Sequence, residues 1–208
     1  MDAVKKYAKE RKIPHLVHFT NIKNLESIIE YGLVPRDLLE DIEGESYIND
    51  PHRFDGHADS VSLSIAFPNC QMFYSLWNGS SEQYCILGLH PEVLWNYECA
   101  FCKHNAADNL ISGQNINDLK SVSAFEGMYD EFPWVRSRVD QKLKPYDPTD
   151  VQAEVLVFDI IDPKYIVGIV FPDQSLARDY QDIIGNREAL VHRPRKDFYG
   201  SRSFSREY

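Results

Sequence analysis

Two short segments combine residue types that can act on a substrate. Gln152-Ala153-Glu154 opens the strongest strand pattern of the chain, VQAEVLVFD, and residues i and i+2 of a strand share a face. A carboxylate in such an apolar strand costs free energy unless it has a partner or a chemical role. His18-Phe19-Thr20 ends an earlier strand pattern. Taken alone, Glu154 is explained as well by a strand-end acid facing water as by a functional role. His18 taken alone is better explained as a hydrogen-bonded structural histidine than as a functional residue.

The four cysteines do not follow the pattern of a metal site. Cys99 and Cys102 form a C-x-x-C pair with His104 two residues later, but Cys70 and Cys85 stand alone, so a second ligand pair is missing. The pair also lacks the βαβ surroundings of a thioredoxin-like redox motif. We therefore expect buried or partly buried thiols and no metal.

Length, composition and charge limit the class of protein. The chain has 208 residues, of which 43% are hydrophobic, and it carries 22 Lys+Arg against 32 Asp+Glu, a formal charge of −10. We expect one domain, residues 1–208, and a cytoplasmic location, because neither a bilayer-spanning apolar run nor the apolar stretch of a signal peptide is present. The motifs G-x-S-x-G, H-E-x-x-H and G-x-x-x-x-G-K-[ST] are absent. The acidic balance argues against general phosphate binding, which depends on Lys and Arg.

The segment 13–35 predicts the element that positions His18. HLVHF is short and apolar enough for a strand, and Thr20 or Asn21 fits the N-cap of a following helix. Gly32 then suits a left-handed helix end, and Pro35 prevents continuation. The buried face of this helix is predicted by the spacing of Ile22, Leu25, Ile28 and Ile29.

The remaining patterns favour short strands over helices. Strands are predicted at 60–67, 84–90, 151–159 and 165–171. Helices are predicted near 132–143 and 174–186, with one helical turn at 91–95, a short helix in the acidic loop 36–58, and a helix or strand at 72–77. This order predicts an α+β fold with a mostly antiparallel sheet.

Four blocks of the sequence resemble a known family of enzymes. The blocks are HFTNIKNLESII…GL at 18–33, HRFDGHADSVSLSIAFPNCQMFY at 52–74, FCKHNAAD at 101–108 and DVQAEVLVFDIIDPKYI at 150–166. They are similar in kind and order to the DarT family, NAD-dependent ADP-ribosyltransferases of the PARP and diphtheria-toxin type that modify nucleic-acid bases. The resemblance implies an ADP-ribosyltransferase fold, with two small, mostly antiparallel sheets flanked by short helices around an NAD cleft. NAD would be a co-substrate, and no metal would be needed.

The resemblance implies that Glu154 and Arg53 are catalytic. Breaking the nicotinamide–ribose bond passes through an oxocarbenium-like state, as in glycoside hydrolysis, and nicotinamide leaves as a neutral ring. One carboxylate then suffices: Glu154 would bind the ribose 2′-hydroxyl, stabilise the positive charge and help to deprotonate the incoming base. Arg53 would bind the pyrophosphate or polarise the acceptor.

The other residues carried over by the resemblance would bind NAD or the acceptor. His18 would hold ribose hydroxyls, Thr20 would seat the nicotinamide or its ribose, and Tyr74 would stack on the nicotinamide ring. Asn105 lies in the family-like NAAD segment, where it could also form a turn. Gln152 would face the acceptor. The structural alternatives stay open, with Tyr74 as a core aromatic and Gln152 as an ordinary polar residue at a strand start.

Basic residues gather in two places where nucleic acid could lie. Between 192 and 208, five basic residues face two acidic ones, and four aromatic residues are interleaved with them. Cations that follow phosphates, with aromatics for stacking, are typical of single-strand binding, and Arg193 and Arg195 are the acceptor candidates here. A second basic group lies in the segment 127–150, which takes the place of the family's acceptor-presenting segment. This group consists of Arg136, Arg138, Lys142 and Lys144.

Several acceptors agree with this resemblance. Single-stranded DNA is the first expectation, RNA modification by a CmdT-like, phage-defence branch is the second, and protein is the third. A catalytically inactive nucleotide-binding protein is disfavoured because both His18 and Glu154 are present. An RNA 2′-phosphotransferase is disfavoured because it would need several basic residues in place of Glu154. An active enzyme of this kind would be a toxin, so we also expect an antitoxin partner.

Overall fold

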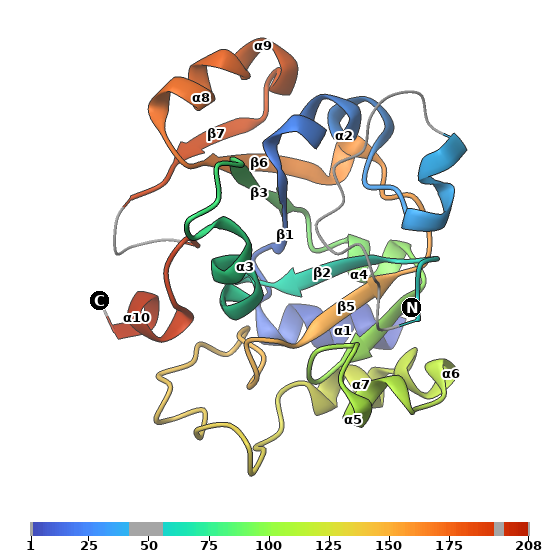
Figure 1. Ribbon diagram of the computed structural model, residues 1–208. Helices are drawn as coiled ribbons and strands as arrows, with labels where there is room; N and C mark the ends of the chain where they lie inside the picture. The colour runs from blue at the N-terminus through green and yellow to red at the C-terminus, as the bar shows by residue number, and fades with distance from the viewer. Residues whose placement is uncertain (1, 42–55, 194–197, 208) are drawn as a thin grey trace.

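The computed structural model describes residues 2–41, 56–193 and 198–207, which form a sheet flanked by short helices (Figure 1). The described strands are β1 (Leu16–Asn21), β2 (Val61–Ile65), β3 (Tyr84–Leu89), β4 (Cys99–Cys102), β5 (Glu154–Val157), β6 (Ile166–Phe171) and β7 (Glu188–Val191). Their order is β4-β5-β2-β1-β3-β6-β7, and each neighbouring pair is antiparallel except β6 and β7. The predicted α+β class and mostly antiparallel sheet are therefore confirmed.

The helices are short. Those described are α1 (Asp2–Arg11), α2 (Leu25–Tyr31), α3 (Cys70–Trp77), α4 (Val93–Asn96), α5 (Asn109–Ser112), α6 (Ile116–Leu119), α7 (Val122–Gly127), α8 (Gln174–Asp179), α9 (Gln181–Ile184) and α10 (Arg202–Glu207). Three 3₁₀ helices accompany them: η1 (Ile22–Asn24), η2 (Arg36–Asp41) and η3 (Pro163–Tyr165). None of the described helices is long and apolar enough to cross a membrane.

The two halves of the sheet are joined by very few residues. β1 pairs with β2 only at Leu16↔Ile65 and Val17↔Ser64, whereas it pairs with β3 along its whole length. Beyond Val17, β1 follows β3 and β2 follows β5, so the two central strands diverge (Figure 1). The expectation of two separate sheets was wrong, because these two residue pairs make the sheet continuous. The divergence nevertheless leaves β1 and β2 unpaired beyond these two residue pairs, and we call this unpaired stretch the opening of the sheet.

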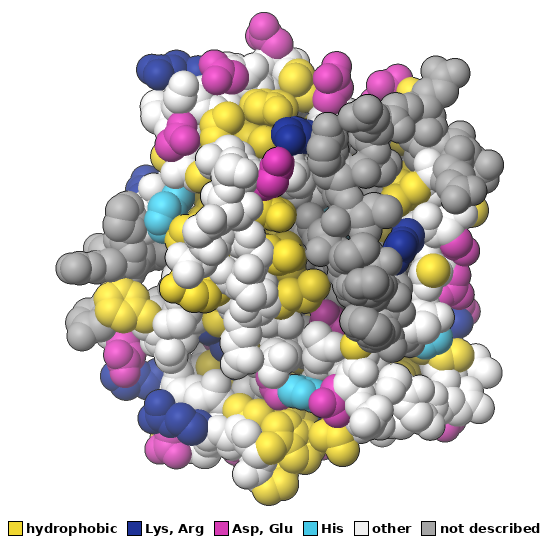
Figure 2. All heavy atoms as spheres, viewed as in Figure 1, with side chains coloured by type: hydrophobic (Ala, Val, Ile, Leu, Met, Phe, Trp, Pro, Cys, Tyr) yellow, Lys and Arg dark blue, Asp and Glu magenta, His cyan; other side chains and the backbone are white. Residues whose placement is uncertain are grey.

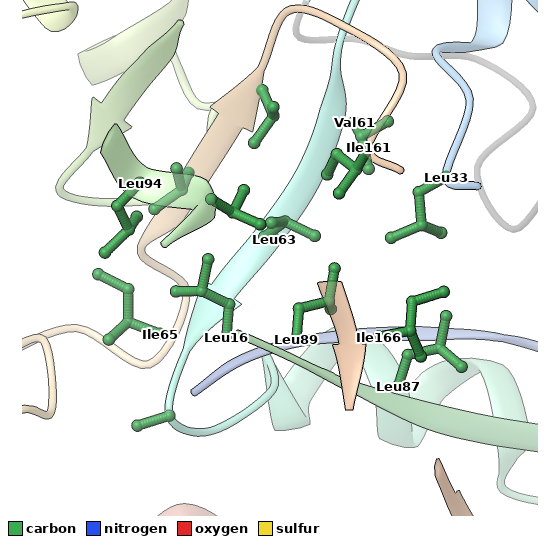
Figure 3. Close-up of a cluster of buried hydrophobic side chains, with 14 of the residues drawn as sticks. Leu16, Leu33, Val61, Leu63, Ile65, Leu87, Leu89, Leu94, Ile161 and Ile166 are labelled. Atoms are coloured by element: carbon green, nitrogen blue, oxygen red, sulfur yellow. The ribbon is translucent and has the colours of Figure 1, made fainter. Parts of the chain in front are cut away.

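Buried apolar side chains from both halves meet below this divergence (Figure 3). Leu16 of β1, Leu63 of β2 and Leu89 of β3 are each at most 1% exposed. Because they pack in one cluster, the hydrophobic effect holds the halves together where backbone pairing has stopped. The angle between β1 and β2 is thus fixed by core packing rather than by strand hydrogen bonds.

The predicted unit at 13–35 is confirmed and its turn is tightly constrained. The Asn21 side chain accepts a hydrogen bond from the Lys23 N–H at 3.0 Å, which caps η1. After α2, Gly32 takes a φ of +94° and Leu33 pairs with Ile161. A Cβ on Gly32 would lie 2.2 Å from the Ile161 carbonyl oxygen. Glycine is therefore required both by the backbone conformation and by the close approach of the chain.

Several local predictions differ from the structure. The helix expected near 132–143 is wrong, since this segment is a series of turns, in which the Gln141 side chain donates to the Arg136 carbonyl and the Arg136 side chain donates to the Asp140 carbonyl. The strand expected at 151–159 is shorter, because Asp150 binds the N–H of Gln152 in a turn and β5 starts only at Glu154. The segment 72–77 is helical, within α3, and the predicted helix at 174–186 is confirmed as α8 and α9. β4 and β7 were not predicted.

Replacing Gly32 by alanine should destabilise the fold strongly. The positive φ costs about 1–2 kcal/mol for an L-residue, and the clash with Ile161 adds a similar amount, so we expect a loss of about 2–4 kcal/mol. Chemical denaturation measures it. Gly79→Ala is the matched control, because Gly79 has a φ of +78° and a Cβ there would meet no atom within 4 Å, so this variant reports backbone strain alone. Equal losses in the two variants would contradict the role given to the contact with Ile161.

Candidate active site

His18 spans the opening between the diverging strands. Its Nδ1 lies 2.9 Å from the backbone carbonyl oxygen of Ser62 on β2, just beyond the last β1–β2 pair. A carbonyl oxygen only accepts, so Nδ1 carries the proton and donates this bond. In the neutral imidazole Nε2 is then an acceptor, the state that suits it to bind a hydroxyl group. The His18 side chain thus bonds to β2 where the backbone pairing between β1 and β2 has stopped.

Glu154 lies on the other side of the divergence, at the start of β5. Its Oε2 accepts a hydrogen bond from the Ala106 N–H at 2.8 Å, and the residue is 9% exposed. Val155 belongs to the main core, whereas Leu156 packs on the opposite face of the sheet, and alternation puts Glu154 on that face with Leu156. A backbone N–H bond to a carboxylate is charge-assisted and fixes the group in one orientation.

The strand register connects these two residues. Ser62, whose carbonyl binds His18, is the register partner of Leu156, and Leu63 is the partner of Val155. Leu156 and Glu154 are two positions apart in β5. The backbone positions of His18 and Glu154 therefore lie on either side of the same stretch of β2, one in each half of the sheet.

Asn105 shapes the turn that supports Glu154. Its side-chain oxygen accepts the Ala107 N–H at 2.9 Å and its backbone oxygen accepts the Asp108 N–H at 3.1 Å. These bonds fold the chain so that the intervening N–H, that of Ala106, is directed at the carboxylate. The turn-forming alternative for Asn105 is thus what the structure shows.

A histidine and an aspartate that were not predicted as site residues complete this support. His104 Nδ1 lies 2.8 Å from Asp150 Oδ2, and the second oxygen of Asp150 accepts the Gln152 N–H at 2.8 Å. Asp150 is only 4% exposed. The bond joins the loop after β4 to the turn before β5, 46 residues later in the chain. Both residues lie inside the blocks that carried the family resemblance, which was the one signal that could have marked them.

Thr20 and Tyr74 have contrasting environments. Thr20 is 2% exposed and its hydroxyl accepts a hydrogen bond from the Asn24 side chain at 2.9 Å, so it supports the turn into α2. Tyr74 is 55% exposed on α3, with its ring edge-on to Trp77 at 5.8 Å. α3 lies against β1, since the ring centroids of Phe73 and Phe19 are 5.0 Å apart. The Tyr74 ring is therefore accessible for stacking, and its alternative as a core aromatic was wrong.

Some predicted residues are not placed. Arg53 and Arg195 lie outside the described residues. Arg193 is exposed after β7, and Gln152 is half-buried in the turn before β5.

The expectation of a basic, aromatic tail available to nucleic acid was wrong for residues 198–207. Tyr199 is buried and its hydroxyl donates to the Tyr84 carbonyl at 2.6 Å, while Phe198 packs on the same apolar cluster. Arg202 and Arg206 are bound to the segment 147–149. These side chains pack or form hydrogen bonds within the protein, because the tail returns to the sheet and covers an apolar face.

Only part of the second basic group is available to bind phosphates. Arg138 donates to the backbone oxygens of Asp147 and Lys144 and to the Thr149 hydroxyl, and burial lowers its pKa. Exposed cations in this segment are Arg136, Lys142 and Lys144.

An aromatic surface lies beside the Glu154 support. Trp134 is 44% exposed and stacks on Phe132 with ring centroids 4.9 Å apart and planes 6° apart. His104 meets Trp134 edge-on at 6.5 Å. Figure 2 shows apolar side chains gathered at the lower edge of this face, next to a histidine and acidic side chains. This surface was not predicted, because nothing in the local sequence distinguishes Trp134 from a core tryptophan.

The cysteines are buried or half-buried as predicted. Cys85, Cys99 and Cys102 are at most 6% exposed, and Cys70 is half-buried. Burial raises the pKa of the Cys85 and Cys99 thiols to about 12, which keeps them protonated at neutral pH. Within residues 2–41, 56–193 and 198–207, no three His, Cys, Asp or Glu side chains cluster as metal ligands would.

Comparison with known proteins gives a family and a fold. Residues 17–200 match the family model described as "ssDNA thymidine ADP-ribosyltransferase, DarT". No curated protein matches the chain.

Solved structures of low sequence identity share the fold. Thermosipho africanus DarTG in complex with ADP-ribose is 19% identical, with a TM-score of 0.60 over 89% of this chain, and this chain spans 50% of that one. Thermus sp. 2.9 DarT in complex with carba-NAD⁺ is 16% identical, with a TM-score of 0.56 over 88% of this chain and 96% of that one. The same Thermus protein in complex with ADP-ribosylated ssDNA is 13% identical, with a TM-score of 0.57 over 87% and 95%.

The expected ADP-ribosyltransferase fold is confirmed by these structures, and the match of the family model extends over most of the sequence. The chain belongs to the DarT family of NAD-dependent ADP-ribosyltransferases.

Proposed function

We propose that the chain transfers ADP-ribose from NAD to a thymidine base in single-stranded DNA and releases nicotinamide. The observation that carries the proposal is the pair His18 and Glu154, which flank one stretch of β2 where the sheet opens. The family description names the same reaction, and the Thermus relative is seen with ADP-ribosylated ssDNA.

The residues present fit NAD as a co-substrate. His18 offers an acceptor nitrogen to a ribose hydroxyl, and the exposed ring of Tyr74 can stack on the nicotinamide. Thr20 acts indirectly, because its hydroxyl already binds Asn24 and holds the turn beside His18. Arg53 is assigned to the pyrophosphate or the acceptor from the family resemblance.

Glu154 performs two tasks in this mechanism. When the bond between ribose C1′ and the nicotinamide nitrogen breaks, positive charge develops on the ribose, and the oriented carboxylate stabilises it. The new bond then forms between C1′ and a ring nitrogen of the base. Glu154 accepts the proton that this nitrogen loses. Nicotinamide takes the electron pair of the broken C1′–N bond and leaves as a neutral ring, so no acid is required to protonate it.

The acceptor strand lies on the face that carries Trp134. This ring, stacked on Phe132 and next to His104, offers an apolar platform for a base neighbouring the one that reacts. Gln152 is tied through Asp150 to the same region and faces the acceptor. Arg136, Lys142 and Lys144 supply exposed charge for phosphates, and we assign the same role to Arg193 and Arg195.

A toxic activity of this kind would require a neutralising partner. The Thermosipho relative is named DarTG and is about twice as long as the region matched here. We propose that residues 1–208 form one catalytic domain and that an antitoxin protein, or a hydrolase that removes the mark, acts on it or on its product.

Replacing Glu154 by glutamine should abolish transfer while preserving the fold. The amide oxygen can still accept the Ala106 N–H, but the charge and the proton acceptor are lost, so we expect the rate to fall at least about 100-fold. Transfer of labelled ADP-ribose to a thymidine-containing oligonucleotide measures it, with a thermal melt to verify folding. The control is Glu188→Gln, an exposed glutamate that also starts a strand. Retained activity in Glu154→Gln would rule out the assignment.

The nature of the acceptor is tested with matched single strands. Labelled NAD is incubated with a DNA oligonucleotide that contains one thymidine and, separately, with the same oligonucleotide in which cytidine replaces the thymidine. Two further reactions contain the RNA oligonucleotide of the corresponding sequence and a mixture of proteins. We expect label on the first strand alone, because a thymine ring nitrogen is the group that loses its proton. Label on RNA only would favour the CmdT-like, phage-defence alternative. Label on protein only would favour an enzyme that modifies proteins.

Replacing Trp134 by alanine should weaken DNA binding and leave the NAD site intact. One base–aromatic stack contributes about 1–3 kcal/mol, so the KM for the oligonucleotide should rise about tenfold or more, with the KM for NAD unchanged. Steady-state kinetics with each substrate varied in turn measures both constants. Val139→Ala is the control, since Val139 is 83% exposed in the same segment. An unchanged KM for DNA would place the acceptor elsewhere.

A further inference from the structure

The segment 147–149 is held by arginine side chains at each of its residues. Asp147, Pro148 and Thr149 each offer a backbone oxygen to a guanidinium, at 2.7, 2.8 and 2.9 Å respectively. The donors are Arg138 for Asp147 and Arg202 for the other two. All three residues of the segment are buried. A stretch without helix or strand is thereby given a fixed backbone path.

Arg206 binds the same segment through the carboxylate of Asp147. Its Nε and Nη2 donate to Oδ2 and Oδ1 of Asp147 at 2.7 and 2.6 Å, which is a two-bond fork. The Asp147 side chain is fully buried, and its Oδ2 also accepts the Lys144 N–H at 2.9 Å. Such a buried pair is costly to break, because one partner would be left charged and without compensation.

Arg202 is the more deeply buried of the two α10 arginines. It is 4% exposed, and burial lowers its pKa to about 10. An apolar side chain would fill the same space without the cost of desolvating a guanidinium, but it could not bind two backbone carbonyls. The use of arginine here therefore favours a defined backbone position over maximum stability. We call Arg202 and Arg206, with their bonds to 147–149, the α10 clamp.

The clamped segment leads directly to the catalytic residues. Asp150 follows it and binds both the Gln152 N–H and His104. His104 precedes the turn whose Ala106 N–H binds Glu154, and Glu154 itself lies four residues after Asp150. Asp150 is therefore connected to Glu154 in two ways, along the chain through Gln152 and through its bond to His104.

The clamp lies at the end of the chain, away from the sheet's opening. Figure 1 shows α10 beside the long loop that precedes β5. The family model ends at residue 200, so α10 is outside the residues that it matches. We propose that Arg202 and Arg206 are positioning residues. By fixing the backbone of residues 147–150, they hold Gln152 and Glu154 in the positions needed when the acceptor base attacks the ribose. This inference rests on the proposed function and adds a control element to it.

Lysine variants of the clamp test the proposal in the full chain. Arg206→Lys and Arg202→Lys keep the charge but cannot form the fork or bind two carbonyls. We expect kcat for transfer to the thymidine oligonucleotide to fall about tenfold or more, with the KM for NAD within about twofold. Hydrogen exchange of the amides of 147–152 should become faster in both variants, while exchange in β1 and β3 stays unchanged. Arg178→Lys, at an exposed arginine of α8, is the control.

Three results would overturn the proposal. Exchange of 147–152 could stay unchanged in both variants, transfer could stay unchanged although exchange is faster, or exchange could rise throughout the sheet, which would indicate a general loss of stability. If the unsubstituted chain itself transfers nothing to DNA, the proposed function is wrong, and exchange alone then decides whether the clamp fixes 147–152.

Discussion

The early end of pairing between β1 and β2 is the constraint on which the rest of the structure depends. Two residue pairs keep the sheet continuous, and beyond them the strands part, with the His18 imidazole bound to the Ser62 carbonyl across the gap. Backbone groups that lose a strand partner must find another or face solvent. Here a side chain supplies one of those partners, so the opening is stable without being closed. The strands on either side of this opening belong to different halves of the sheet, so residues distant in sequence border it.

Glu154 is placed by a chain of polar contacts rather than by its strand alone. β5 has only four residues, and its first residue would be the one most prone to fraying. The Ala106 N–H, the Asn105 turn and the bond between His104 and Asp150 hold it in place. These contacts are buried or half-buried, where hydrogen bonds to charged groups are strong and costly to lose.

Some of the chain's basic side chains are bound within the protein. Arg138, Arg202 and Arg206 contribute to the count of basic residues, but their guanidinium groups are bound to carbonyls and to Asp147. The charge available to phosphates is therefore smaller than the sequence indicates, and base stacking and a single reacting base must carry more of the recognition.

Local patterns predicted the parts of this structure that depend on local physics. The strand with His18, the Asn21 cap and the turn at Gly32 follow from spacing and residue type, and so do β3 and β6. The pairing of His104 with Asp150 could not be predicted, because it joins residues 46 positions apart through tertiary structure. The helix predicted near 132–143 failed for a related reason. Within that segment Arg138 donates to the Asp147 carbonyl and Gln141 accepts a hydrogen bond from Arg202 of α10, and no local pattern records these contacts. The tail was misjudged because basic and aromatic residues look alike whether they bind a ligand or the protein itself.

Binding of carba-NAD⁺ to the intact chain, measured by calorimetry, tests most directly whether the opened sheet is the NAD site. The unsubstituted chain should bind this analogue, His18→Ala should weaken binding about tenfold or more, and Glu154→Gln should bind nearly as well as the unsubstituted chain, because its role is in the reaction. His90→Ala, at an exposed histidine, should have no effect. Absence of binding, or equal affinities for the unsubstituted chain and His18→Ala, would contradict the placement of NAD between β1 and β2.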